Sequence, residues 1–400
     1  MDAPTRDKLM ALAQEQAQPA VNFCRRLIQT PSMSGQEGDA ARLVEAEMLR
    51  LGYDRVWIDD VGNVIGLIRG SGGGPRLQFN THLDHVDPGD PQDWSYPPYA
   101  ATIHAGAIWG RGACDLKGPM ATQVHALAAL KQAGISFRAD VYVVAVVFEE
   151  RAGLGSRFLA KTLPCDYAVI GEATGNRLMR GHRGRTEIIV EFTGRSVHAS
   201  MPTLGVNPHF SAARFLTGMG DLPMVHDDFL GPATVAPTLY LSDQMSANVV
   251  PGRVELHLDW RHVPSEDPAT ILERLQPLLD DSLTGGCQGG LRLPQVQAVT
   301  WTGQEHTWPL ISPGFTVAAD DPLVTTAKSA LEQLYGHDVP VGHWRFATDG
   351  GHLTQAGVSC IGFAPGDETL VHTVREHIVI DDMIEGMAGN MALALALGEL

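Results

Sequence analysis

The sequence predicts an α/β fold in which a second, compact domain is inserted into the first. Residues 38–172 alternate helical patterns with short apolar strands, which is typical of a mostly parallel sheet covered on both faces. From about residue 180 apolar and polar residues alternate instead, as in half-buried strands, and the α/β pattern returns after Asp321. The first domain is therefore expected to be discontinuous. Its expected segments are 1–178 and 307–400, and the insertion is expected at 179–306.

Length and composition agree with two folded domains. The chain has 400 residues, more than one hydrophobic core usually supports. Of these residues 44% are hydrophobic and 19% are charged, which is ordinary globular usage rather than the low hydrophobicity of disordered chains.

The first domain shows helices that end at glycines and strands that are continuous apolar runs. One helix ends at Gly52, and another begins near Pro119 and ends at Gly134. Strands are expected at 76–80, 141–148 and 167–170. The segment Gly70–Pro75 is rich in glycine but lacks the Gly-Lys-Ser/Thr ending of a phosphate loop, so we interpret it as a hairpin turn.

The inserted segment has its own order of elements. Alternation over 187–192 and 254–261 predicts two strands with one face towards solvent. The expected order is a strand at 188–192, a helix at 207–218, strands at 234–241 and 254–261, a helix at 267–280 and a strand at 291–300. This β-α-β-β-α-β arrangement is the ferredoxin-like order.

Charge and cysteine usage exclude several functional classes. A net charge of -17 without a basic run makes the surface repel phosphate backbones, so we expect no nucleic-acid partner. The five cysteines are odd in number and lack a C-x-x-C spacing, which disfavours a disulfide framework or a zinc knuckle. The first residues lack a signal-peptide core, and the longest apolar run, 141–148, is too short to cross a bilayer. We therefore expect a cytoplasmic protein with no membrane partner.

Histidines and carboxylates stand where apolar strands end. His82 and Asp84 follow one strand, and Glu149 and Glu150 follow the next. An isolated H-x-D segment is often an ordinary polar loop. Two adjacent carboxylates, however, repel each other unless a cation or a catalytic task offsets the cost.

Three further residues occupy comparable positions. Glu172 terminates the strand at 167–170, Asp115 lies just before a helix, and His372 follows another apparent strand. In a doubly wound sheet the carboxyl ends of the strands face one crevice. Mixed ligation by histidine, aspartate and glutamate is typical of hydrolytic zinc, cobalt or manganese centres. The pattern therefore favours a metal-dependent hydrolase.

Six short motifs along nearly the whole chain match one enzyme family. They are His82-Leu83-Asp84, Gly110-Arg111-Gly112 through Asp115-Leu116-Lys117-Gly118, Glu149-Glu150, Gly171-Glu172-Ala173-Thr174, Ser196-Val197-His198-Ala199-Ser200-Met201-Pro202, and His372 with Glu376. Together they resemble the M20 metallopeptidases and deacylases. That family includes succinyl-diaminopimelate desuccinylase, acetylornithine deacetylase, aminoacylase-1 and glutamate carboxypeptidase.

The resemblance implies a zinc-exopeptidase-like catalytic domain and an inserted lid and dimerisation domain. It also implies two divalent metal ions, zinc in the first place, with cobalt or manganese as alternatives. Asp115 would bridge the ions, one of which would also be held by His82 and Glu172 and the other by Glu150 and His372.

The resemblance also implies catalytic roles beside the ligands. Glu149 would be the general base that takes a proton from a metal-activated water and passes it to the leaving nitrogen. Asp84 would orient His82.

In the lid, the resemblance points to three more residues. In dimeric relatives the histidine that matches His198 crosses from the partner subunit to stabilise the oxyanion, which implies a homodimer through the lid. Otherwise His198 could cap the helix near Asn207. Asn248 and Arg261 match lid positions that bind a substrate carboxylate, although Arg261 could instead pair with an acid on a neighbouring strand.

The sequence departs from the family pattern at a few positions. Ala364 replaces a glycine before the last ligand, Ala173 replaces a proline, and Arg375 replaces an aspartate or asparagine. None of these is a ligand, but Arg375 could alter the charge of the pocket. Glutamate at position 172 is the residue type of the desuccinylase and deacetylase branches.

The expected function is hydrolysis of an amide bond in a small substrate with a free carboxylate, in the first place deacylation of an N-acyl amino acid. A dipeptidase or carboxypeptidase is the alternative. A catalytically inactive binding protein would be expected to lack a ligand or the base, and all six residues are present. Residues 110–115 lack the third glycine of a dinucleotide fingerprint, and no G-x-S-x-G elbow of a serine hydrolase occurs.

Overall fold

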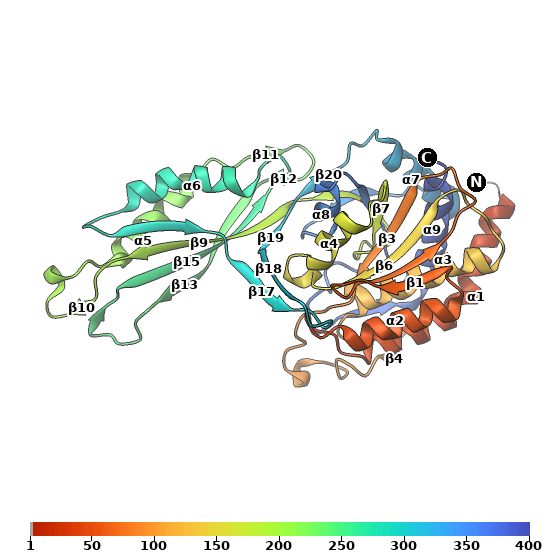
Figure 1. The fold of residues 1–400 in the computed structure, drawn as a ribbon, viewed down its shortest axis with the longest axis horizontal. Coiled ribbons are helices and arrows are strands. Elements are labelled where there is room, and N and C mark those ends of the chain that lie inside the picture. The colour runs from red at the N-terminus through yellow and green to blue at the C-terminus, as the bar shows by residue number, and fades with distance from the viewer. Residues whose placement is uncertain (1–2) are drawn as a thin grey trace.

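A computed structural model describes residues 3–400, which form two lobes (Figure 1). Each lobe has its own hydrophobic core. The core of the larger domain collects buried residues from Leu9 to Met179 and again from Val296 to Leu397. The core of the smaller domain collects residues from Ile188 to Cys287. The chain therefore leaves the larger core once and returns to it.

A nine-stranded sheet forms the centre of the larger domain. Its strands are β1 (Arg55–Ile58), β2 (Val64–Ile68), β6 (Asp140–Val146), β3 (Arg76–His82), β7 (Tyr167–Ile170), β22 (Ser359–Gly362), β8 (Leu178–His182) and β20 (Phe315–Thr316), in this order, with β21 (Val341–Trp344) also on β8. The neighbours β6, β3, β7 and β22 are parallel, whereas β1, β2 and β20 run antiparallel to their neighbours and β8 runs antiparallel to β22. The sheet is thus mixed, and the expectation of a mostly parallel sheet is wrong.

Short connections explain the antiparallel flank. A parallel pair needs a crossover of a dozen or more residues. Only residues 59–63 separate β1 from β2, and only 69–75 separate β2 from β3. Each pair of consecutive strands must therefore reverse direction, which apolar runs alone do not reveal.

The glycine-rich segment Gly70–Pro75 is not a hairpin turn. It joins β2 to β3, but β6 lies between these strands. The segment passes close to the residues that lead into β6, and a Cβ at Gly70 would collide with the carbonyl oxygens of Arg138 and Ala139. Glycine is required there for close backbone approach.

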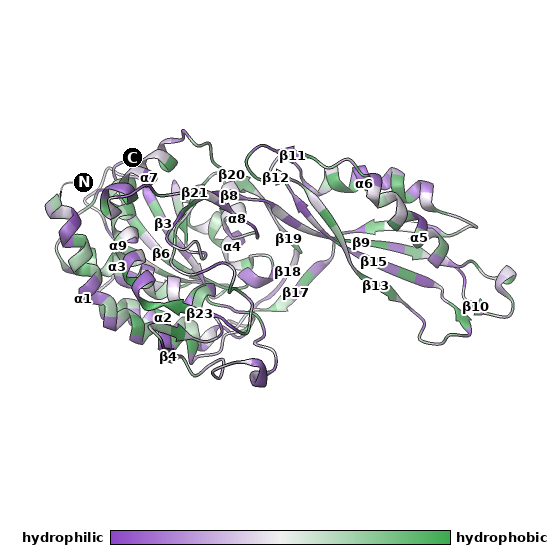
Figure 2. Cartoon of the chain, turned by 180° about the vertical axis from the view of Figure 1, so that it is seen from behind, coloured by the Kyte–Doolittle hydropathy of each residue, from purple (hydrophilic) through white to green (hydrophobic). Residues whose placement is uncertain are grey.

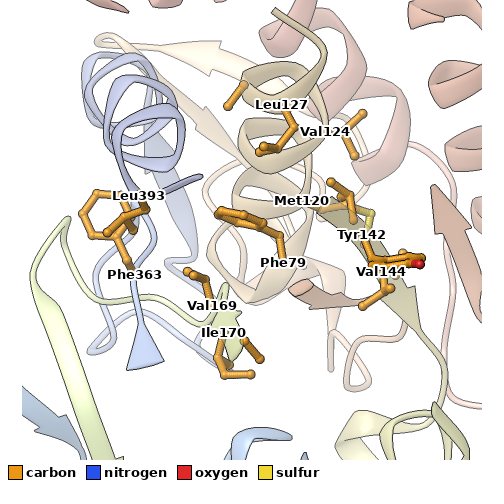
Figure 3. Close-up of a cluster of buried hydrophobic side chains, with 14 of the residues drawn as sticks. Phe79, Met120, Val124, Leu127, Tyr142, Val144, Val169, Ile170, Phe363 and Leu393 are labelled. Atoms are coloured by element: carbon orange, nitrogen blue, oxygen red, sulfur yellow. The ribbon is translucent and has the colours of Figure 1, made fainter. Parts of the chain in front are cut away.

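Helices cover the central sheet. They are α1 (Ala3–Ile28), α2 (Gly38–Leu51), α3 (Gly118–Gln132), α4 (Leu154–Thr162), α7 (Pro322–Tyr335), α8 (Gly350–Gln355) and α9 (Ile380–Leu397). The expected helices at Gly52 and Pro119 are confirmed as α2 and α3. Figure 3 shows Met120, Val124 and Leu127 of α3 in one buried cluster with Phe79 of β3 and Leu393 of α9. This packing fixes the strands whose ends carry the candidate ligands.

The smaller domain has the expected β-α-β-β-α-β order. Its elements are β9 (Gly184–Thr193), α5 (Pro208–Gly218), β13 (Thr234–Ser242), β15 (Arg253–His262), α6 (Pro268–Ser282) and β16 (Gln288–Arg292). The sheet order is β13-β15-β9-β16, all antiparallel. Figure 2 shows hydrophilic and hydrophobic residues mixed along β9, β13 and β15, as expected for strands with one face on a core.

The expected strand at 291–300 is wrong because it is divided. Pro294 cannot donate to a strand ladder, and β16 ends before it. Beyond it, β17 (Gln295–Val299) pairs with β18 (Glu305–Pro309), and Val296 and Trp308 pack into the larger core. The chain then forms β19 (Ile311–Ser312), which pairs with β9.

The remaining strands form three small sheets. They are β10 (Val197–His198) with β14 (Val249–Val250), β11 (His226–Asp227) with β12 (Gly231–Pro232), and β4 (Thr102–His104) with β5 (Ala107–Trp109) and β23 (His377–Val379). No helix within residues 3–400 is long and apolar enough to cross a membrane. All five cysteines are buried and unbridged.

Candidate metal centre

The ends of three parallel strands bring the first candidate ligands together. His82 is the last residue of β3 and pairs with Val146 of β6, so Glu149 and Glu150 follow just beyond. In the ladder between β3 and β7, Asn80 pairs with Ile170, which places Glu172 level with His82. The register of the sheet therefore produces the cluster that the strand-end pattern predicted.

His82 is oriented from its Nδ1 side. Its Nδ1 lies 2.9 Å from the carbonyl oxygen of Asp84 and 3.7 Å from the Asp84 carboxylate. A proton held on Nδ1 leaves Nε2 available as a ligand. On the other side, Nε2 lies 2.9 Å from Asp115 Oδ1 and 3.6 Å from Glu172 Oε1.

The carboxylate of Asp84 holds the turn that carries Glu149 and Glu150. The backbone N–H of Glu149 donates to Asp84 Oδ1 at 3.0 Å and that of Glu150 to Oδ2 at 3.2 Å. The hydroxyl of Ser34 donates to Oδ2 at 2.6 Å. Phe148 enters this turn with φ 56, a left-handed conformation that is uncommon for a bulky residue. Asp84 thus positions two acids in addition to His82.

Asp115 lies between the two histidines. Its Oδ1 faces His82, and its Oδ2 lies 3.0 Å from His372 Nε2. The same His372 nitrogen lies 3.0 Å from Glu150 Oε1. One carboxylate therefore touches two imidazoles through separate oxygens, the arrangement required of a bridging ligand.

Glu376 fixes the segment that carries Asp115. Its buried carboxylate accepts hydrogen bonds from the backbone N–H groups of Gly112, Cys114 and Asp115 at 3.1, 3.0 and 3.2 Å. It also accepts one from Arg111 at 2.5 Å. The motif that pairs His372 with Glu376 thus contains one candidate ligand, His372, and the residue that holds the loop of another candidate ligand, Asp115.

Burial and mutual repulsion make the acids of the cluster hard to ionise. Burial, with the neighbouring carboxylates of Glu172 and Asp349, raises the pKa of Glu149 well above its usual value, although His82 opposes this. Burial and Asp115 likewise raise the pKa of Glu172 and of Glu150. Positive charge placed among these groups would favour their ionised forms.

The pKa shifts of Asp115 and His372 favour the charged forms of these two groups instead. Burial would raise the pKa of Asp115, but hydrogen bonds with His372 and His82 outweigh it and hold this pKa below the usual range. Burial would lower the pKa of His372, but Asp115 and Glu150 raise it to about 10. Protons on the histidines thus supply the positive charge that cations could supply instead.

The donor set fits divalent metal ions. Two groups of three residues each offer possible ligand atoms that lie within 4.8 Å of one another. The first group is His82, Glu149 and Glu172, and the second group is His82, Asp115 and Glu150. Imidazole nitrogens with carboxylate oxygens suit zinc, cobalt and manganese. His372 completes the second group through its contacts with Asp115 and Glu150.

The cluster opens into a cavity of about 410 Å³ between the two domains. Asp115, Glu149, Glu150, Glu172 and His372 form one wall, and Arg185 and Arg261 of the smaller domain form part of another. A hollow of about 490 Å³ between α1, α7 and α9 has no titratable residue among its described lining residues, so it offers no comparable chemistry.

Arg261 reaches the cavity while pairing with an acid of its own strand. Its Nε donates to Asp259 Oδ1 at 2.6 Å. The expected pair with an acid on a neighbouring strand is therefore wrong, because the acid lies on β15 itself, and the binding of a substrate carboxylate by Arg261 stays a prediction. Arg185 was missed, although extending the polar face of its strand two residues back from Glu187 would have placed it on the same face.

His198 and Asn248 are not brought to this cavity. They lie on and beside β10 and β14, and Figure 1 shows β10 at the end of the smaller domain that is far from the larger one. His198 Nδ1 contacts Ser200 Oγ at 2.8 Å, so it does not cap α5. Asn207 provides that cap by accepting from His209 N at 3.1 Å.

Two other sequence expectations change. Arg375 is exposed on a turn and does not line the cavity, so the expectation that it alters the pocket's charge is not supported. Asp349, which sequence reasoning missed, is fully buried beside Gly153, and burial raises its pKa to about 6. No apolar strand ends directly before Asp349, so the strand-end pattern could not find it.

Comparison with known proteins decides the family. Residues 78–396, well over half of the chain, match the profile described as peptidase family M20/M25/M40. The chain belongs to this family. It is an M20-type metallohydrolase.

Relatives of this M20 protein cover most of its length. An uncharacterised Escherichia coli K12 protein, YgeY, is 29% identical over 361 residues, 88% of each chain. A succinyl-diaminopimelate desuccinylase of Thioalkalivibrio sulfidiphilus is 24% identical over 381 residues, 91% of this chain and 94% of that protein.

Solved M20 structures share the fold. Aminopeptidase PepT from Bacillus cereus superposes with a TM-score of 0.77 at 19% identity, over 96% of this chain and 99% of that one. Bacillus subtilis YXEP, a dinuclear metal-binding peptidase of the M20 family, gives 0.72 at 15% identity, over 96% and 99%.

Proposed function

We propose that this protein hydrolyses an amide bond in a small carboxylate-bearing substrate, in the first place an N-acyl amino acid, with two divalent cations bound at the candidate metal centre. The observation that carries the proposal is Asp115, whose two carboxylate oxygens lie 2.9 and 3.0 Å from the Nε2 atoms of His82 and His372. A bridging carboxylate between two imidazoles is suited to a pair of ions.

The ligand assignment follows the two sides of Asp115. His82 and Glu172 would hold one ion, and Glu150 and His372 the other, with zinc as the first candidate and cobalt or manganese as alternatives. When bound, the ions would supply Lewis acidity and ease the ionisation of a water molecule near neutral pH.

Glu149 would act as the general base. It lies on the cavity wall beside the ligands, its Oε2 is 4.0 Å from His82 Nε2, and its neighbours raise its pKa. A raised pKa suits a group that must accept a proton from the attacking water and return it to the leaving nitrogen. Asp84 would hold Glu149 in place through its backbone bond to Glu149 N.

His198 and Asn248 would act across a dimer interface. They lie too far out on the smaller domain to reach the cavity of their own chain, so a second copy of the lid would have to bring them there. In residues 3–400, β13 is an edge strand that pairs only with β15 and exposes Leu239, Tyr240 and Leu241. An edge with exposed apolar side chains favours pairing with another chain.

The acyl side of the scissile amide distinguishes the two candidate reactions, and two observations bear on it. Glu172 and the desuccinylase relative favour deacylation. The names of the two structural neighbours favour a peptidase as the second candidate. Both reactions use the same cluster, so only substrates can separate them.

The test is a panel of N-acetyl amino acids, N-succinyl amino acids and dipeptides, each with zinc, cobalt or manganese supplied separately. Glu149→Ala should abolish turnover of every substrate found, while metal content stays unchanged. Glu15→Ala, an exposed acid on α1, is the control. Retained turnover in Glu149→Ala would show that the assigned base is wrong.

A mixing experiment tests the dimer. Neither His198→Ala nor Glu149→Ala alone should be active, but mixed dimers of the two should recover activity, because one cavity would then contain both native residues. Light scattering should show a dimer. Verified mixed dimers without activity would argue against a role for His198 in trans.

A further inference from the structure

Two arginines face each other on the lid wall of the cavity. In the antiparallel ladder of β9 and β15, Arg185 is directly opposite Arg261. Like charges at directly opposite positions destabilise a sheet. The pair therefore needs an anion to offset the repulsion.

Asp259 provides only part of that negative charge. Its Oδ2 accepts from Arg185 Nε at 2.7 Å, and its Oδ1 accepts from Arg261 Nε at 2.6 Å. Within hydrogen-bond distance the two guanidinium groups therefore share one carboxylate. Glu187 is a more distant ion-pair partner of Arg185, at 3.9 Å, and it also contacts His257 at 2.8 Å.

Both guanidinium groups keep donors free for such an anion. Arg185 uses its Nε on Asp259, whereas Arg261 uses its Nε and, at 3.3 Å, its Nη2. Glu187 Oε2 is 3.9 Å from Arg185 Nη2, an ion pair that is too long for a hydrogen bond. Within residues 3–400 no hydrogen bond from an Arg185 Nη atom is found. The side chains of Arg185 and Arg261 are 37% and 31% exposed, and both line the cavity.

The rest of the β9–β15 ladder has no comparable pair of facing arginines. At the distal end of β15, Arg253 pairs with Glu191 and Glu255, at 3.6 and 2.9 Å. Arg292 also pairs with Glu255, and His257 pairs with Glu187. The pair of facing arginines thus occurs where the face meets the cavity, opposite the candidate metal centre.

We propose that Arg185, together with Arg261, binds a carboxylate of the substrate and is a specificity-determining residue. This inference rests on the proposed function and narrows its substrate class to compounds with an anionic group within reach of both arginines. A planar carboxylate matches the forked donors of guanidinium groups, and Asp259 holds both forks by their Nε edges. Neutral or cationic analogues would leave the Nη donors of Arg185 without an anionic acceptor.

The test compares the acid that is hydrolysed fastest in the panel with its carboxamide, which has the same shape without the charge. The enzyme should prefer the acid in kcat/KM. Arg185→Gln should raise KM for the acid about ten- to a hundredfold with kcat nearly unchanged, and should leave the carboxamide unaffected. Arg185→Lys keeps the positive charge but loses the forked donors, so its KM for the acid should lie between that of the wild type and that of Arg185→Gln.

Arg253→Gln is the matched control, because it removes an ion-paired arginine from the same sheet face outside the cavity. Thermal unfolding of every variant checks folding. Equal losses for acid and carboxamide, or no loss for either, in folded Arg185→Gln would overturn the inference while leaving the proposed function intact. A wild-type enzyme that hydrolyses no carboxylate compound would instead overturn both.

Discussion

The cavity has two walls that hold their charged groups in different ways. The metal side is the wall at the candidate metal centre, and the lid side is the wall on the smaller domain, which is the proposed lid. On the metal side, His82 and Asp115 are buried, and backbone groups hold them and their neighbours through Asp84 and Glu376. On the lid side, Arg185 and Arg261 are partly exposed and are held by side-chain bonds to Asp259. One wall belongs to the larger domain, and the other belongs to the smaller domain.

This difference has a functional meaning. Groups that must keep sub-ångström positions during bond breaking benefit from a buried, prearranged setting. Groups that only select and hold a substrate can belong to a domain that moves relative to the centre. Changes on the metal side should therefore act mainly on kcat and metal binding, and changes on the lid side mainly on KM.

The largest effect is expected from removing the side chain of a proposed metal ligand, His372. His372→Ala should lower kcat by at least about a thousandfold and reduce the metal content from two ions towards one per chain, because Asp115 and Glu150 would lose their shared partner. Elemental analysis and steady-state kinetics measure both. His337→Ala, on an exposed turn, is the control. A change in KM without a change in kcat or metal content would contradict the expected difference between the two walls.

A smaller effect is expected from Glu376, which holds the loop of the proposed ligand Asp115 but is not itself a proposed ligand. Glu376→Gln places an amide donor among the N–H groups of Gly112, Cys114 and Asp115, so metal affinity should fall about ten- to a hundredfold. Competition with a chelator measures the affinity, and the KM of the residual activity should change little. Unchanged affinity in a folded variant would show that Glu376 serves stability alone.

Metal binding should also depend on pH. The pKa of His372 is raised to about 10, and Asp115 raises the pKa of His82 despite burial, so the metal-free protein favours protons on both imidazoles. Because a cation must displace them, affinity should fall about tenfold per unit decrease in pH for each proton displaced. Calorimetry at pH 7 in two buffers with different ionisation enthalpies should reveal proton release. Identical heats in both buffers would contradict it.

The smallest effect is expected at the hairpin of β17 and β18, which packs against Phe148, the residue before the proposed base Glu149. Trp308 Nε1 donates to Arg151 O at 2.8 Å, and its ring packs on Phe148. Trp308→Phe should keep the packing but lose the bond, which costs about 1 kcal/mol of unfolding free energy and a few-fold in kcat. Urea unfolding and kinetics check both. A loss as large as that of His372→Ala would mean that this hairpin determines the position of Glu149.

Most of the metal side could be predicted from the sequence because strand ends are visible in it. The apolar runs stop at His82, Glu150 and Glu172. Parallel pairing of the strands is enough to bring these residues together. The roles proposed for Asp115 and His372 rest on the family resemblance, because Asp115 precedes a helix and His372 lies well beyond the end of β22. The contacts of Glu376 with residues 111–115 span more than 260 positions and have no local pattern.

The lid side and the sheet order were harder to predict. Arg185 looks like any solvent-facing residue of an alternating strand, and only the arrangement of the two domains turns it towards the cavity. The mixed sheet depends on connection lengths around β2, and the division of the strand at Pro294 depends on where β17 finds its partner. These features follow from long-range packing that periodicity does not contain.

The burial of all five cysteines offers a way to observe the lid directly. A thiol reagent should leave the folded wild-type chain almost unlabelled, because burial also raises the pKa of Cys24, Cys165 and Cys360 to about 12. Cysteines introduced at the exposed positions Glu15 and Glu273, one on each domain, could then carry a pair of spectroscopic probes without prior removal of native thiols. The distance between the probes, followed with and without substrate, would report whether the two walls approach each other during turnover.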